Sequence, residues 1–161
     1  MIFAIDPGNE YSAYVICDDE LKPIEFGKVE NGKVIHEIRM AVITYEKIDF
    51  AIEMVASYGM PVGAEVFETC VWIGRFLHEI GEAKLIYRKD EKMNLCHSMR
   101  ANDATIKQAL VDRFAKGTTN HGKGTKNNPG WFYGFKADIW AAYAVAVTYH
   151  DLKKHLFNYG E

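Results

Sequence analysis

The feature that most constrains the fold is a series of short apolar runs in the first third of the chain. Residues 2–5 are continuously apolar. They are followed by Asp6-Pro7-Gly8-Asn9, a combination of residues typical of a turn. A continuous run of this kind is typical of a strand buried on both faces. Two more strand-like runs, at 11–18 and about 23–30, follow after short breaks. Short connections predict that the three strands form an antiparallel meander.

The following segments alternate between helical and extended patterns. Residues 33–46 carry apolar side chains at helical spacing, and residues 48–54 form another short apolar run. A strand, a helix and a further strand in this order predict a parallel crossover back into the sheet. The remaining predicted elements are a helix at 64–81, a strand at 84–88, a helix from Asn102 or Asp103 to about 115, and a helix at about 138–155. We therefore expect an α/β fold with a five-stranded mixed sheet flanked by helices.

The length of the chain and its cysteines suggest a simple organisation. The 161 residues correspond to one domain, which we expect to span 1–161. No basic region precedes the first apolar run, and no stretch approaches the roughly 20 apolar residues that span a bilayer. Cys17, Cys70 and Cys96 are far apart and are interpreted as free thiols of a reducing compartment. These features predict a cytoplasmic protein.

The charge of the chain is unevenly distributed, although its net value is only −3. Between Lys84 and Lys136 there are eleven basic residues and four acidic ones, so this segment carries +7 and the remainder −10. A basic face can bind phosphate even when the whole chain is acidic. A merely solvated charged surface is the alternative interpretation.

Three carboxylates lie where a core-facing acid is unexpected: Asp6 after the first strand, Glu53 near the end of the fourth, and Asp138 at the start of the alanine-rich last helix. Each has a structural alternative, respectively a turn, a solvent-facing side chain and a helix cap. If the first and fourth strands are adjacent, Asp6 and Glu53 are neighbours, and like charges that close need a compensating cation. Mg²⁺ binds carboxylates, water and phosphate, and paired ions can drive phosphodiester hydrolysis.

Residues 116–136 form an unusually long segment without periodicity, rich in Gly, Asn and Lys. Basic residues interleaved with aromatic ones suit phosphate contacts and stacking on unpaired bases. The alternative is that Trp131-Phe132-Tyr133 packs into the core. The predicted DNA-contacting residues, including basic residues before this segment, are Arg88, Lys89, Arg100, Lys116, Lys123, Lys126, Trp131 and Lys136.

Taken in order, these motifs resemble a known family. Ile5-Asp6-Pro7-Gly8 with Ser12-Ala13, the strand ending in Glu53, and Asp138 followed by spaced alanines are similar to the RuvC-type Holliday junction resolvases of the ribonuclease H-like superfamily. The resemblance spans essentially the whole chain. The stretches that look like the phage-encoded branch are Tyr58-Gly59-Met60-Pro61-Val62-Gly63, Trp72-Ile73-Gly74-Arg75-Phe76 and Asn128-Pro129-Gly130.

The resemblance implies a ribonuclease H-like fold and a homodimer that cuts four-way DNA junctions with two symmetric nicks. It implies Mg²⁺ as cofactor, with Mn²⁺ able to substitute, and Asp6, Glu53 and Asp138 as metal-binding catalytic residues. A phage-encoded protein would act in the host cytoplasm. The chain departs from the family at one point, because the family usually has two ligands three residues apart at the last helix. Here Ala141 lies three residues after Asp138 and Phe135 three residues before it, so a fourth ligand is not visible. Asp103, Lys136 or water are the candidate substitutes.

Several alternatives remain open at this point. The departure at Ala141 leaves room for a weakened enzyme or for a non-catalytic branched-DNA-binding protein. A less selective nuclease acting on forks, flaps or RNA–DNA hybrids is another alternative. A sugar-kinase or actin-like protein would need two such domains, and this chain has room for one. In the helix at 64–81, Trp72, Arg75 and Phe76 suggest an apolar face for dimer contact, although packing within one domain is equally compatible.

Overall fold

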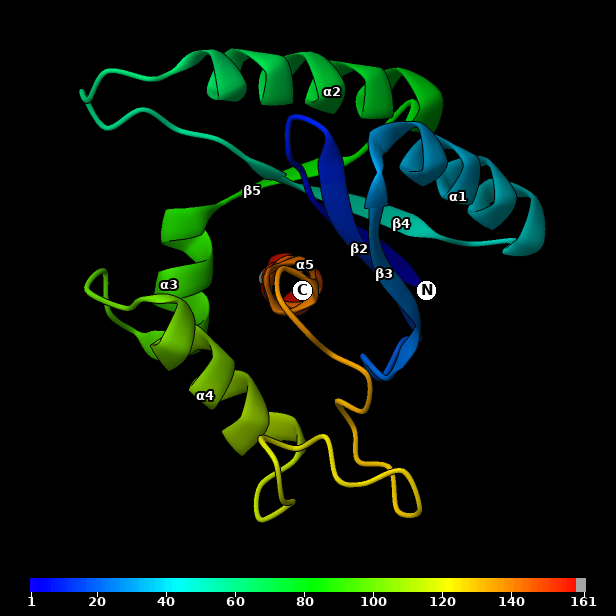
Figure 1. The fold of residues 1–161 in the computed structure, drawn as a ribbon, viewed down its shortest axis with the longest axis vertical. Helices are drawn as coiled ribbons and strands as arrows, with labels where there is room; N and C mark the ends of the chain where they lie inside the picture. The colour runs from blue at the N-terminus through cyan, green and yellow to red at the C-terminus, as the bar shows by residue number, and fades with distance from the viewer. Residues whose placement is uncertain (159–161) are drawn as a thin grey trace.

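The computed structural model describes residues 1–158, within which five strands and five helices form one layered arrangement (Figure 1). The predicted domain of residues 1–161 is thus described up to residue 158. The strands are β1 (Ile2–Asp6), β2 (Tyr11–Cys17), β3 (Pro23–Glu30), β4 (Asp49–Met54) and β5 (Lys84–Tyr87). The helices are α1 (Asn31–Thr44), α2 (Ala64–Ile80), α3 (Arg88–Cys96), α4 (Asp103–Phe114) and α5 (Ile139–Asn158).

The strands form a single mixed sheet in the order β3-β2-β1-β4-β5. β1 pairs with β2 and β2 with β3 in antiparallel fashion, while β4 runs parallel to both β1 and β5. The predicted meander, the parallel crossover and the mixed five-stranded sheet are therefore confirmed. Ile5 lies opposite Ile52, so the next residues along these two strands, Asp6 and Glu53, lie side by side.

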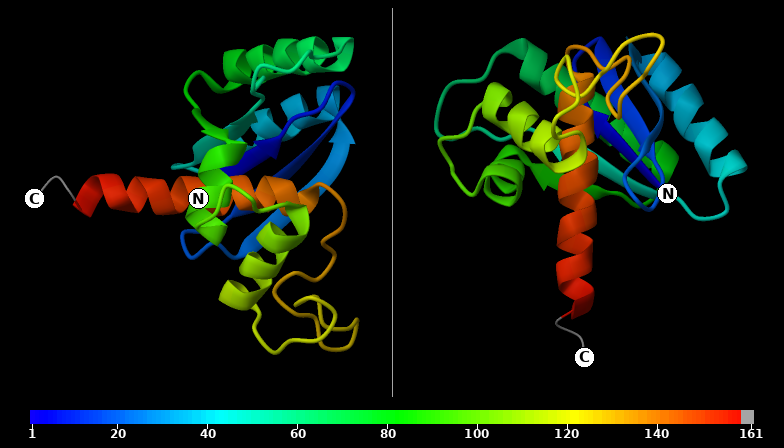
Figure 2. Two further views of the ribbon diagram at one scale, coloured as in Figure 1. Left: turned by 90° about the vertical axis from the view of Figure 1, so that its left-hand side faces the viewer. Right: turned by 90° about the horizontal axis from the view of Figure 1, so that it is seen from below.

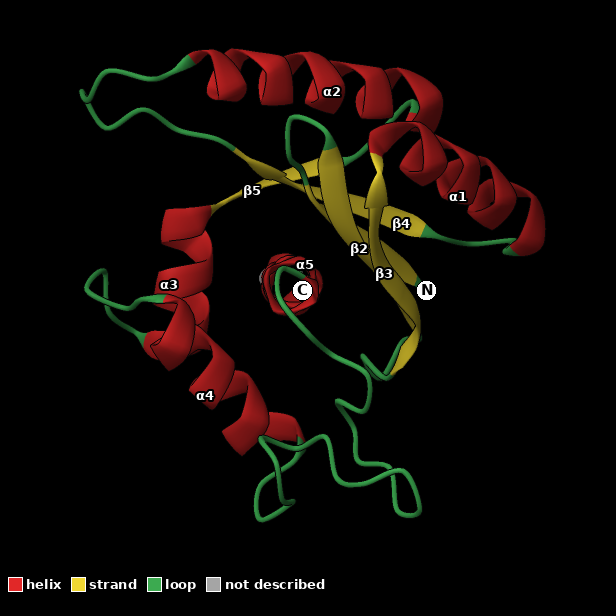
Figure 3. Cartoon of the chain, in the orientation of Figure 1, coloured by secondary structure: helices red, strands yellow, loops and turns green. Residues whose placement is uncertain are grey.

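Helices cover both faces of the sheet (Figure 3). α1 and α2 pack on one face, where Phe3, Ile5 and Ile52 of the strands are buried. α5 runs across the other face, with α3 and α4 beside it (Figure 1). On this side the buried strand residues include small alanines at positions 4, 13 and 51, which let the alanine-rich start of α5 approach closely.

Two helices differ from the sequence prediction. No helix was expected at 88–96, yet α3 occupies these residues and its one buried position is Glu91. A helix whose core position is charged shows no apolar stripe, so periodicity does not reveal it. In α2, Phe76 is fully buried and Trp72 packs against it, with ring centroids 5.9 Å apart. The exposed apolar side chains of this helix are instead Phe67 and Val71.

The far end of α5 projects away from the body of the protein (Figure 2). All three cysteines are free, as predicted, and Cys17 is buried in the core. Within the described part of the chain, no helix combines the length and apolarity needed to cross a membrane.

Candidate active site

Asp6 and Glu53 form the centre of the candidate site. They stand at the carboxyl ends of two adjacent parallel strands, close enough for the charge of Glu53 to raise the pKa of Asp6. Because side chains alternate along a strand, Asp6 points to the same face as Ala4, and Glu53 to the same face as Ala51. This is the face covered by α5. Burial, followed by the charges of Glu53 and Asp138, raises the pKa of Asp6 from its usual 3.8 to about 8.

The turn after Asp6 is held by a small polar network. The Gly8 amide donates to Ser12 Oγ at 3.0 Å, and Ser12 Oγ donates to Asn31 Oδ1 at 2.6 Å. Asn31 Nδ2 closes the ring by donating to the Gly8 carbonyl at 2.9 Å. A Cβ at Gly8 would lie only 2.2 Å from the Tyr11 carbonyl oxygen, so the close approach requires glycine here. These residues fix where β1 ends and therefore where Asp6 points.

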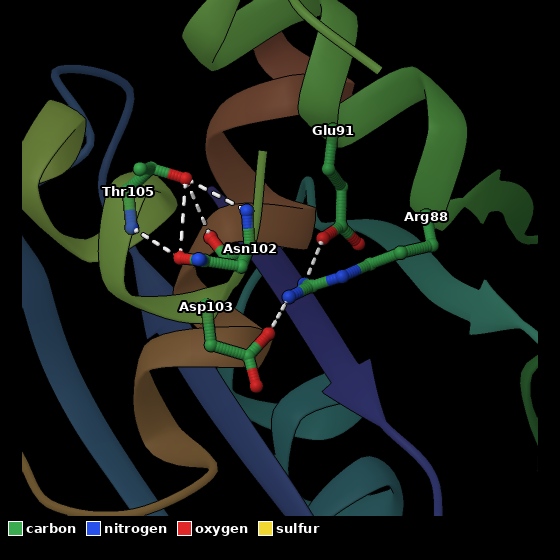
Figure 4. Close-up of polar contacts among 5 residues, drawn as sticks. All are labelled: Arg88, Glu91, Asn102, Asp103 and Thr105. Atoms are coloured by element: carbon green, nitrogen blue, oxygen red, sulfur yellow. Dashed lines mark hydrogen bonds and ion pairs between the residues drawn. The ribbon is translucent and has the colours of Figure 1, made fainter. Parts of the chain in front are cut away.

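Glu91 is the acidic residue that sequence analysis missed. Its side chain is fully buried, and Oε2 accepts a hydrogen bond from Arg88 Nη1 at 2.6 Å (Figure 4). Oε1 has no hydrogen-bond partner in the described structure. Burial and the nearby charge of Glu53 raise the pKa of Glu91 to about 8. One residue in the sequence could have indicated helix α3. The Asp90 carboxylate accepts a hydrogen bond from the Tyr87 amide at 3.1 Å, an arrangement typical of the start of a helix.

Asp138 and Asp103 occupy the rim of the site. Asp138 lies just before α5, where its carboxylate forms an ion pair with Lys28 of β3. Asp103 is 94% exposed and pairs with Arg88, while the neighbouring Asn102 caps α4 by accepting from the Thr105 amide (Figure 4). A solvent-facing carboxylate held by an arginine is a weak candidate for the substitute ligand.

A cavity and an open hollow extend from the rim of the site. Asp138, Ala141 and Arg88 line a cavity of about 80 Å³. Next to it, Lys107, Lys123 and Lys136 line a hollow of about 390 Å³ together with Trp140. Lys107 was not among the predicted DNA contacts. Of the remaining predicted basic residues, Lys89, Arg100, Lys116 and Lys126 are exposed outside the lining of this hollow.

Trp131, a predicted DNA contact, is partly buried and packs against other aromatic residues. Its ring stacks on Phe114 with centroids 5.5 Å apart, and its Nε1 donates to the Tyr143 hydroxyl at 3.0 Å. Phe132 is fully buried in the same aromatic cluster, whereas Tyr133 is exposed. Of the three aromatic residues, Trp131 and Phe132 therefore pack against the core, as the alternative interpretation of this stretch predicts.

No protein-family model and no curated protein sequence matches the chain. Solved structures do match it. A Thermus thermophilus RuvC structure aligns with a TM-score of 0.62 at 16% identity, covering 96% of each chain. The structure of T. thermophilus RuvC in complex with a Holliday junction substrate aligns with a TM-score of 0.60 at 14% identity, covering 91% of this chain and 90% of that one. The chain has the fold of RuvC. This establishes the expected ribonuclease H-like fold.

The acidic residues of this RuvC-like fold suit a hard divalent cation. Within residues 1–158, no three His, Cys, Asp or Glu side chains converge closely enough to hold an ion as they are arranged. The Asp6–Glu53 pair nevertheless provides two adjacent carboxylates, and Mg²⁺ commonly uses one or two carboxylates completed by water and substrate phosphate. Glu91 Oε1, which is buried without a hydrogen-bond partner in the described structure, is a further oxygen of this region that a cation could contact.

Proposed function

We propose that this chain is a divalent-metal-dependent endonuclease that resolves four-way DNA junctions, of the type found in the phage-encoded branch of the RuvC-type resolvases. The observation that carries the proposal is the Asp6–Glu53 pair at adjacent strand ends, with Asp138 on the rim near enough for its charge to raise the pKa of Asp6. A cation would compensate the negative charge that burial and the neighbouring carboxylate make unfavourable on Asp6. The similar structure that contains a Holliday junction substrate supports branched DNA as the ligand.

In this proposal Asp6, Glu53 and Asp138 hold Mg²⁺, with Mn²⁺ able to replace it. The bound cation supplies an activated water and stabilises charge on the leaving oxygen of the phosphodiester. Asp6 would have to release its proton, and Asp138 would have to loosen its ion pair with Lys28. Both changes become easier when a positive charge arrives at the site.

The basic residues near the site provide the DNA contacts. Lys123 and Lys136 line the hollow that begins beside Asp138, and Lys107 adds a third cation there. Contacts of this kind bind phosphates and position the backbone without reading sequence. The outer DNA-contacting residues in this proposal are Arg88, Lys89, Arg100, Lys116 and Lys126. Tyr133 is the exposed aromatic side chain that takes over the stacking role first assigned to Trp131.

The proposed enzyme acts as a homodimer, because a four-way junction offers two equivalent strands to a two-fold assembly. Phe67 and Val71 expose apolar surface one helical turn apart on α2, and Tyr58 and Met60 of the preceding loop are also exposed. Exposed apolar surface of this kind is typical of a protein contact. A Val71→Glu variant is expected to sediment as a monomer at concentrations where the wild type is dimeric.

The test of the proposed activity separates catalysis from binding. Asp6→Asn removes a metal ligand and leaves the basic surface intact, so junction cleavage in Mg²⁺ should be lost while junction binding persists. Asp112→Asn, which changes an exposed acid on α4, is the matched control and should cleave normally. Full cleavage by the Asp6→Asn variant would contradict the proposed site.

A second candidate is a branched-DNA-binding protein without efficient catalysis. It is favoured by Ala141, which lines the cavity beside Asp138 where the resemblance implies a ligand. Tight junction binding with no nick in either Mg²⁺ or Mn²⁺ would support it. Competition among junction, fork, flap and duplex substrates separates the junction-selective enzyme from a less selective nuclease.

A further inference from the structure

We propose that Glu91 is an additional cation-binding carboxylate of this active site, entering from α3 in place of a ligand at position 141, and that Arg88 is the counter-ion that a metal displaces from it. The inference rests on the proposed metal site. It concerns a residue outside the set that the family resemblance implies.

The environment of Glu91 is the first argument. Its side chain is fully buried, and Arg88 satisfies only Oε2, which leaves Oε1 without a partner in the described structure. Buried carboxylate oxygens are almost always hydrogen-bonded, because an unpaired one loses the solvation that it had in water. A half-satisfied buried carboxylate therefore calls for a partner that the chain itself does not supply.

The place of Glu91 in the fold is the second argument. β5 lies parallel to β4 with Ile86 opposite Glu53, and α3 begins directly after β5. Glu91 therefore enters the site from its β5 side, and its charge acts on both Glu53 and Asp6. Ala141 of α5 contributes only a methyl group to the cavity that Asp138 and Arg88 also line.

Arg88 is the third argument. Its guanidinium donates to buried Glu91 and also pairs with exposed Asp103, so one side chain bridges the interior and the surface (Figure 4). It also lines the cavity that Ala141 leaves open. A guanidinium here supplies the positive charge that Glu91 needs in the absence of metal. A divalent cation would compete for the same carboxylate, and the released Arg88 would be free to bind a DNA phosphate.

The experiment measures Mn²⁺ affinity of the full-length protein without DNA, by following free Mn²⁺ with electron paramagnetic resonance. Glu91→Gln keeps the shape of the side chain and removes its charge, so Mn²⁺ affinity should fall by about tenfold or more. Arg88→Met removes the competing cation, so Mn²⁺ affinity should rise. Opposite effects of the two variants support the proposal. A purely structural ion pair predicts no change in either variant or a loss in both, and either result would overturn it.

Further variants separate folding from ligation. Asp90→Asn weakens the start of α3 but keeps Glu91, so it should retain Mn²⁺ affinity within a few-fold. If Glu91→Gln fails to fold, Glu91→Asp keeps the charge but shortens its reach, and it should still bind Mn²⁺ more weakly than the wild type. Wild-type affinity in Glu91→Asp would then refute the role of Glu91.

Asp6→Asn distinguishes this inference from the proposed function on which it rests. Loss of Mn²⁺ binding in Asp6→Asn with wild-type affinity in Glu91→Gln would refute only the role of Glu91. Unchanged Mn²⁺ binding in Asp6→Asn would refute the metal site itself, and the inference with it.

Discussion

We expect the contribution of Asp6 to the stability of the metal-free protein to fall as the pH rises, because its pKa is raised. This pKa is about 8 in the folded state, against an ordinary value near 3.8. Between these values the folded protein keeps a proton that the unfolded chain has released. By linkage, the free energy of unfolding then falls with rising pH, by up to about 1.4 kcal/mol per pH unit for one such group.

Over the interval from pH 5 to pH 7, this relation gives a loss of up to about 3 kcal/mol from Asp6. Replacing Asp6 with Asn removes the group whose proton the folded protein retains over this interval. The variant should therefore lose less stability over the same interval and should be more stable than the wild type at pH 7. The catalytic defect and the gain in stability come from the same substitution, as is common at strained active sites.

The assay is urea unfolding followed by circular dichroism, at pH 5, 6 and 7 in the presence of a chelator. Asp112→Asn serves as the control and should follow the wild type at each pH. Added Mg²⁺ should raise the free energy of unfolding of the wild-type protein at pH 7 far more than that of the Asp6→Asn variant. The reason is that the ion binds tightly only to the ionised pair of carboxylates. An Asp6→Asn variant that is less stable than the wild type at pH 7, or equally dependent on pH, would refute the reasoning.

Three further stability predictions can be checked by the same unfolding measurements. Ser12→Ala should lower the free energy of unfolding by about 1–3 kcal/mol, because Asn31 loses its buried donor. Tyr143→Phe should lower it by a similar amount, about 1–3 kcal/mol, and should shift the tryptophan fluorescence, because the Trp131 N–H loses its acceptor. Asp151→Asn should lower the free energy of unfolding at neutral pH. The difference in this free energy between variant and wild type should narrow as the pH falls from 5 toward 2. The reason is that the folded pKa of Asp151 is about 2, and its stabilising effect disappears on protonation. Wild-type stability in either of the first two variants, or a constant difference in the third, would contradict these assignments.

The central strands and the Asp6–Glu53 pair could be predicted because each depends on a local pattern. Continuous apolar runs bounded by turn residues mark buried strands, and the strand–helix–strand order predicts a parallel crossover back into the sheet. The structure shows that this crossover places β4 beside β1. Once these strands are neighbours, the positions of Asp6 and Glu53 follow from the register.

α3 and Glu91 could not be predicted in this way, because the only buried position of α3 is a glutamate. Apolar periodicity finds a helix by the side chains that it removes from water, and this helix removes a carboxylate instead. The glutamate that interrupts the apolar pattern of α3 is also the residue that connects this helix with the candidate site.

Other features depend on residues that meet only in the folded chain. Trp131 contacts Phe114 and Tyr143, which lie outside its own segment. The sequence of that segment alone therefore does not show whether the Trp131 side chain is packed or exposed. α2 carries large apolar residues around most of its circumference, and periodicity alone does not tell that Phe76 faces the sheet while Phe67 faces outward. The partners of both segments are fixed by tertiary contacts that a local sequence pattern does not encode.

Mapping of nick positions on a synthetic four-way junction tests the central claim most directly. With Mg²⁺, the wild-type protein should introduce symmetric nicks in two opposite strands, and Asp6→Asn should bind the same junction without cutting it. Symmetric nicks would support both the activity and the two-fold assembly. Tight binding with an intact junction in both Mg²⁺ and Mn²⁺ would contradict the account.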